Sequence, residues 1–180
     1  MNSGSHYLAT TRFEFQRMKK LVETACSRLN DEEFARRFSE EENSVQIIVQ
    51  HLAGNLLSRW TDFLTSDGEK PWRNRDAEFE QQAISREELM QSLEKGWGEL
   101  FKAIDSLNEE NLLQDITIRN EKLTVIQALQ RQVAHYSYHC GQIVFLAKHI
   151  KGKDWQSLSI PKNKSAEFSA KGTYLGQNPG

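Results

Sequence analysis

The 180-residue chain has few of the residues that several classes of protein depend on. Its two cysteines, Cys26 and Cys140, are too few for a disulfide framework and fit a reducing compartment. Its three prolines all lie outside the segments in which apolar residues repeat at helical spacing. No apolar run approaches the roughly 18 residues that a membrane-spanning helix needs. These absences favour a soluble, cytoplasmic helical protein that has no membrane partner.

The chain also lacks a strong excess of charge of either sign. It has 23 basic and 25 acidic residues, which give a formal net charge of −2. This balance gives no electrostatic reason to expect a nucleic acid as partner. The first residues contain no basic segment followed by an apolar one, so we expect no signal peptide.

Four segments carry apolar residues at the spacing of an amphipathic helix, so the sequence predicts an all-α four-helix bundle. They cover about residues 11–29, 44–65, 85–107 and 124–150. Thr11 and Glu14 have the spacing of a capping box, although the first helix has room to begin nearer Ser5. Ser85 and Thr124 open the last two helices with the same spacing.

The connections between these helices differ in character. Around Arg119, alternating apolar and polar residues predict a short hairpin or extended connection before the last helix. Residues 66–84 form a connection of unusual length for a compact bundle. Its Trp72, Arg73 and Arg75 either clamp an anionic or planar ligand or belong to a crossover packed on the bundle surface.

The composition changes after Trp155, where the chain becomes polar and is interrupted by glycine and proline. We therefore expect a bundle domain over residues 1–155 and an irregular tail over residues 156–180. Leu158, Ile160 and Phe168 are the residues that can dock the tail on the bundle.

His135 and His139 lie four residues apart on the last predicted helix, so both rings can point at one metal ion. Tyr136 stands where the helix of a zinc protease has its glutamate, which excludes that class. The pair borders the predicted inward stripe of this helix, which consists of Leu129, Val133, Cys140, Val144 and Ala147. We interpret Cys140 as a packing residue of that stripe.

His51, on the second predicted helix, is the best candidate for a third ligand. His149 lies about 15 Å from His139 along the same helix, and His6 lies near the start of the chain. A row of Ser44, Ile48, His51, Asn55, Ser58 and Asp62 predicts either a pocket wall or an exposed helix face. Three histidines without a fourth protein ligand are typical of an open catalytic site for zinc, nickel, iron or copper.

The sequence identifies no catalytic side chain beyond a water or thiol activated by the metal. Asn55, one turn from His51, can orient the activated group. Arg59, Arg73 and Tyr138 are candidate contacts for a small-molecule substrate.

The segments "VQIIVQHLAGNLLSRW" and "HYSYHCGQI", with histidines about 84 residues apart, resemble the DinB-like superfamily. "GEKPWRNRD" and "LSIPKNKSAEF" look like one uncharacterised bacterial branch of it, and the resemblance extends to about residue 168. It implies a four-helix bundle of up-down-down-up topology, often a homodimer. It also implies a divalent metal, zinc or nickel, bound by His51, His135 and His139.

The resemblance further implies a function, because characterised members include metal-dependent transferases and isomerases that use low-molecular-weight thiols. A bound metal lowers the pKa of a thiol or water that it coordinates. We therefore expect a thiol S-transferase. Its cosubstrate is a low-molecular-weight thiol, which attacks an electrophilic small molecule. The alternatives are a metal-dependent hydrolase that uses water, and a non-catalytic, dimeric, stress-related metal-binding bundle.

Overall fold

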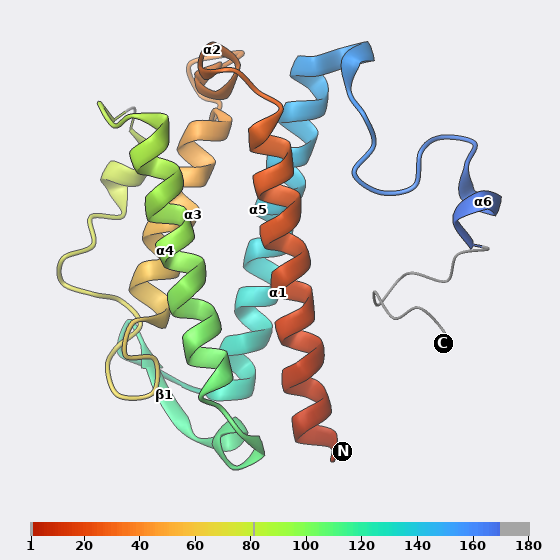
Figure 1. Cartoon of the computed structure of the whole chain (residues 1–180). Coiled ribbons are helices and arrows are strands. Elements are labelled where there is room, and N and C mark those ends of the chain that lie inside the picture. Colours follow the sequence, from red (N-terminus) through yellow and green to blue (C-terminus); the bar gives the residue numbers. More distant parts are fainter. Residues whose placement is uncertain (1, 81, 170–180) are drawn as a thin grey trace.

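The computed structural model describes residues 2–80 and 82–169 of the chain. Within them, four long helices lie side by side: α1 (Ser3–Ser27), α3 (Val45–Trp60), α4 (Arg86–Asp105) and α5 (Val125–Lys151). In Figure 1, α1 and α5 run upward while α3 and α4 run downward. The prediction of a mostly helical fold is confirmed. No described helix is both long enough and apolar enough to cross a bilayer.

Shorter elements join the long helices. The helix α2 (Asp31–Ala35) and the 3₁₀ turns η1 (Asp76–Phe79), η2 (Glu109–Leu113) and η3 (Gly152–Asp154) lie in connections, and α6 (Ser165–Ser169) lies in the tail. Strands β1 (Asp115–Ile118) and β2 (Glu121–Thr124) pair antiparallel, with Ile118 opposite Glu121. The two residues between them, Arg119 and Asn120, have φ angles of 55° and 61°, as a tight two-residue hairpin turn requires. The predicted hairpin is therefore present.

Side-chain caps set the starts of the helices, and one differs from the prediction. Ser85 and Thr124 form the predicted capping boxes of α4 and α5. By contrast, α1 is capped by Asn2, and Thr11 lies buried inside the helix, so the capping box at Thr11 is wrong. The helix α3 ends at Trp60 instead of continuing to about residue 65, because Asp62 adopts a left-handed φ of 51°.

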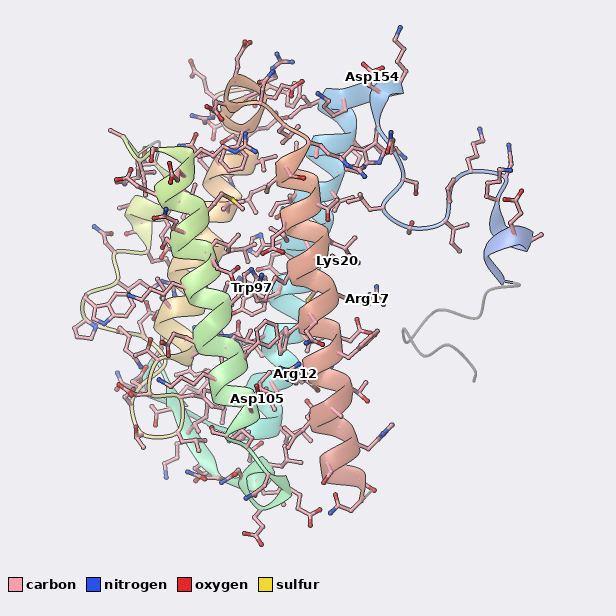
Figure 2. The ribbon with its side chains drawn as sticks, viewed as in Figure 1. Arg12, Arg17, Lys20, Trp97, Asp105 and Asp154 are labelled. Carbon is pink, nitrogen blue, oxygen red and sulfur yellow. The ribbon has the colours of Figure 1, made fainter. Side chains whose placement is uncertain are left out.

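The centre of the bundle is built on four buried aromatic side chains from the four long helices. Phe15 contacts Trp60 and Tyr136 edge to face, with ring centroids 6.1 and 5.7 Å apart, and Trp97 contacts Tyr136 at 5.8 Å. Figure 2 shows Trp97 on the part of α4 that faces into the bundle. Each such pair adds about 0.5–1.5 kcal/mol beyond the burial of its area. Aromatic packing thus fixes the position of α3 against α5.

A surface ion pair also joins two helices. Arg12 of α1 and Asp105 of α4 point toward each other in Figure 2, with Nε and Oδ1 2.7 Å apart. Because both side chains are more than a third exposed, the pair contributes at most about 1 kcal/mol. The core therefore carries most of the stability of the bundle.

The inward face of α5 is rotated relative to the predicted stripe. Val133 and Val144 are only half-buried, whereas Gln132, Tyr136 and Ile143 are buried. Tyr136 is tolerated there because its hydroxyl is fully engaged: it accepts from Trp60 Nε1 and donates to Asn55 Oδ1, both at 3.0 Å.

The connections to the bundle also differ in part from the sequence predictions. Trp72 is 58% exposed, so the tryptophan of residues 66–84 does not pack on the bundle. In the tail, which Figure 1 shows leaving the bundle, Leu158 is half-buried against the core and Ile160 is exposed. The tail contains one short helix, α6, where we predicted irregular chain, and the side chain of Phe168 lies outside the described residues.

A candidate metal centre between α3 and α5

The structure brings the three predicted histidines together. His51 comes from α3 and His135 and His139 from α5, and one ring nitrogen of each lies within 4.8 Å of the others. The ring centroids are 4.7 to 5.3 Å apart. Direct contacts between the rings place His51 of α3 at the same level of the bundle as His135 and His139 of α5. The three rings can therefore hold one metal ion.

Hydrogen bonds orient two of the rings. His51 Nδ1 lies 2.9 Å from Oε2 of Glu78, and His139 Nδ1 lies 2.8 Å from Oε1 of Gln142. In each case the Nδ1–H donates to an oxygen, so the lone pair is on Nε2. The Nε2 atoms of His51 and His135 are 3.3 Å apart. Two nitrogens on a tetrahedral zinc, each at about 2.0–2.1 Å, are separated by about 3.3–3.4 Å. The spacing therefore fits a metal centre.

Glu78 is a residue of this site that the sequence analysis did not single out. It is buried on η1, within the long connection of residues 66–84. Arg73 donates to both of its oxygens, from Nε at 2.7 Å and Nη2 at 2.8 Å. Burial alone would raise the pKa of Glu78, but the hydrogen bonds from His51 and Arg73 outweigh it and lower the pKa. The carboxylate that orients His51 is thus charged at neutral pH.

The close approach of Glu78 depends on a glycine of α3. A Cβ placed on Gly54 would lie 2.1 Å from Oε1 of Glu78, far inside van der Waals contact. Gly54 follows His51 by three residues, so it shares its helix face. The glycine therefore makes room for the carboxylate beside the ligand histidine.

The electrostatics of the site favour neutral imidazoles. Burial lowers the pKa of His135 to about 3, and the charges of the neighbouring histidines contribute a smaller effect in the same direction. Burial likewise lowers the pKa of His139 to about 4, against an opposing hydrogen bond to Gln142. At neutral pH both rings keep the lone pair that a cation needs.

The other candidate ligands lie elsewhere. Burial raises the pKa of Cys140 to about 11, and its sulfur lies 4.0 Å from the carbonyl oxygen of Met18, so the thiol packs in the core. The ring of His149 packs against Phe38 at 4.8 Å.

A cavity of about 420 Å³ opens beside the histidines. Asn55, Arg59 and Tyr138, all predicted from the sequence, line it. Arg73 is not among the lining residues, because its guanidinium is engaged by Glu78. Tyr138 is 53% exposed, with its ring 4.3 Å from that of His139.

The polar row predicted on α3 is not an exposed helix face, and two of its members, His51 and Asn55, line the cavity. Its members Ser44, His51, Asn55 and Ser58 are buried, and only its last residue, Asp62, is exposed. The Oδ1 of Asn55 accepts from Tyr136, so this oxygen is directed to the core.

Three further arginines, Arg75, Arg119 and Arg131, also line the cavity, although no sequence pattern indicates that they lie together. They come from the long connection, the hairpin turn and α5.

A family model described as "Protein of unknown function (DUF1572)" matches residues 2–164. No curated protein and no solved structure matches the chain significantly.

Proposed function

The chain belongs to the DUF1572 family, whose description names no activity, and from this premise we propose that it is a metal-dependent enzyme of the DinB-like type. The family falls within the DinB-like superfamily, in keeping with the sequence resemblance. The four long helices suit the up-down-down-up bundle of that superfamily.

One observation carries the proposal: three imidazoles converge beside a cavity, with the ring of His51 held by a charged carboxylate. Among the described residues, no fourth histidine, cysteine or carboxylate joins the group. This donor set suits zinc or nickel and leaves room for a further ligand, as catalytic sites do and structural sites do not. His51, His135 and His139 would hold the metal. When bound, a divalent cation supplies Lewis acidity, which lowers the pKa of a thiol or water that reaches it.

The reaction that we propose is thiol S-transfer to an electrophilic small molecule. The thiol sulfur forms a bond to the electrophilic carbon, the leaving group departs with its electron pair, and the thiol proton passes to solvent. Within the chain, Glu78 and Gln142 keep the histidine rings in place, and Tyr138 covers one side of the cavity mouth. Hydrolysis, with water in place of the thiol, is the alternative use of the same site.

Metal analysis tests the metal centre. We expect about one zinc or nickel ion per chain in the purified wild type, and loss of the ion in His139→Ala. The matched control is His149→Ala, which removes a histidine from the same helix outside the group and should keep the ion. A wild type that neither contains nor takes up metal at neutral pH would contradict the proposal.

The reaction is tested by following consumption of a panel of electrophiles by the metal-loaded protein, with and without low-molecular-weight thiols. Consumption that requires both thiol and the intact histidines supports the transferase. Thiol-independent consumption supports the hydrolase, and bound metal without either activity supports a non-catalytic, stress-related bundle.

The same resemblance leads us to propose a cytoplasmic homodimer. Light scattering coupled to size-exclusion chromatography tests this assembly, because a dimer doubles the 20.8 kDa mass of the chain.

A further inference from the structure

Arg59 is a buried cation that forms no ion pair with the described residues. It is only 3% exposed and lines the cavity beside the histidines. Its Nε and Nη1 are fully buried and have no hydrogen-bond partner among the described residues, so a ligand in the cavity reaches the guanidinium through Nη2. A buried guanidinium stays charged, and leaving its donors unsatisfied is unfavourable unless something else satisfies them.

Asp67 and Glu69, the carboxylates whose charges act on Arg59, are engaged by other groups. Asp67 accepts hydrogen bonds from the backbone of the hairpin turn and of Glu69. Glu69 in turn forms ion pairs with Arg119, at 2.9 Å, and with Arg73, at 3.6 Å. The protein therefore surrounds Arg59 with acids that are already paired with other groups.

The rest of the cavity is also positive. Its lining contains four arginines and no aspartate or glutamate. Arg131 on α5 also lines the cavity, and its positive charge acts on Arg59. Arg75 and Arg119 are exposed side chains of the same lining. A cleft lined by one sign of charge concentrates ligands of the other sign.

The arginines also lie at a useful distance from the histidines. Arg59 is two helical turns from His51, about 12 Å along the axis, and Arg131 is one turn from His135, about 6 Å. An anion held between Arg59 and Arg131 would leave the remainder of a small molecule extending toward the three imidazoles. A cavity of about 420 Å³ can hold such a molecule.

We propose that the cavity binds an oxyanion, a carboxylate or phosphate group of the substrate or cosubstrate, through the guanidinium of Arg59 with support from Arg131. This assignment names the substrate class of the proposed enzyme and so rests on the proposed function. Guanidinium is the side chain best suited to two-point recognition of either group. A buried guanidinium with no ion pair among the described residues, the excess of arginine and the absence of acidic lining all point to the same ligand chemistry.

Calorimetric titration of the metal-free protein tests the assignment, with inorganic phosphate and malonate as separate probes. We expect saturable binding of at least one probe, weakened about tenfold or more in Arg59→Gln and several-fold in Arg131→Gln. The preference between probes distinguishes a phosphate from a carboxylate ligand. Arg36→Gln, which removes the same charge from an exposed ion pair with Glu32, should bind like the wild type.

The His139→Ala variant separates this inference from the proposed function. Because the arginines need no metal, we expect His139→Ala to bind the probes as the wild type does, even though it loses the metal. Absence of saturable binding to either probe, or unchanged affinity in Arg59→Gln, would overturn the assignment whatever the metal analysis gives. Loss of binding in His139→Ala but not in Arg59→Gln would place the anion on the histidines and overturn it too. If circular dichroism shows that Arg59→Gln is unfolded, Arg131→Gln decides, and unchanged affinity there counts against the assignment.

Discussion

The carboxylate of Glu78 lies between a ligand histidine and a buried arginine: its Oε2 accepts from His51 Nδ1 at 2.9 Å and from Arg73 Nη2 at 2.8 Å. Glu78 belongs to the connection of residues 66–84, which is therefore part of the candidate metal centre and not a passive crossover. Gln50 of α3 anchors this segment, because its Nε2 donates to the backbone oxygens of Ala77, Glu78 and Glu80.

Glu78→Gln should weaken metal binding about 10- to 100-fold, because the neutral amide no longer increases the basicity of His51 or fixes its tautomer. The loss should be measured by competition with a chelator of known affinity. Glu80→Gln, an exposed change two residues away, serves as control and should leave the affinity unchanged. Equal affinities in wild type and Glu78→Gln would show that the carboxylate does not support the ligand.

Gly54→Ala should displace Glu78, because the added methyl group would lie 2.1 Å from Oε1 of the carboxylate. We expect weaker metal binding and a lower melting temperature. Gly98→Ala is the matched control, because this helical glycine has open space where its Cβ would be. That change should raise stability by about 0.5–1 kcal/mol, through helix propensity alone. If both alanines stabilise the protein equally, the close approach of Glu78 is not important.

The elements of this fold with strong local signals were predictable. Ser85 and Thr124 mark helix starts through contacts within three residues, and the hairpin follows from alternation around Arg119. The start of α1 was less predictable, because Asn2 caps a polar first turn without apolar periodicity. The rotation of α5 depends on Tyr136. The hydroxyl of Tyr136 is satisfied by Trp60, which is far from it in the sequence.

The same contrast holds for the site. His51, His135 and His139 could be recognised because helical spacing and the resemblance both indicate them. Glu78 could not, because its contact with His51 spans 27 residues and depends on how the long connection folds over α3. Trp72 and Arg73 drew attention by composition, yet Trp72 is exposed and Arg73 acts through Glu78.

The carboxylate of Asp67, which accepts hydrogen bonds from the hairpin turn, should make the stability of the protein depend on pH. Burial alone would raise its pKa, but hydrogen bonds from the backbone of Asn120, Glu69 and Arg119 outweigh it and lower the pKa below 3.8. The stabilisation that the ionised Asp67 carboxylate provides is therefore fully present above about pH 4. It is lost as the pH falls through the lowered pKa of Asp67. We expect the free energy of unfolding of the wild type to fall more steeply than that of Asp67→Asn as the pH is lowered below about 4.

Urea denaturation across that range measures the difference. Asp115→Asn, on the neighbouring strand, is the control. Within the described residues, the Asp115 carboxylate forms one ion pair, with the exposed Lys122 at 3.8 Å. That variant should follow the pH dependence of the wild type. Parallel curves for the wild type and Asp67→Asn would contradict the role of Asp67.

The two buried arginines near the metal centre should respond oppositely to the same substitution. Arg73→Met leaves the carboxylate of Glu78 buried without its ion-pair partner, so the free energy of unfolding should fall by about 3–5 kcal/mol. Arg59→Met removes a buried cation whose Nε and Nη1 have no partner in the described part of the chain, so stability should be unchanged or rise by about 1 kcal/mol. Urea denaturation of the metal-free proteins compares them directly. A large loss of stability in Arg59→Met would mean that this arginine supports the fold, and its unpaired donors would no longer argue for a bound anion.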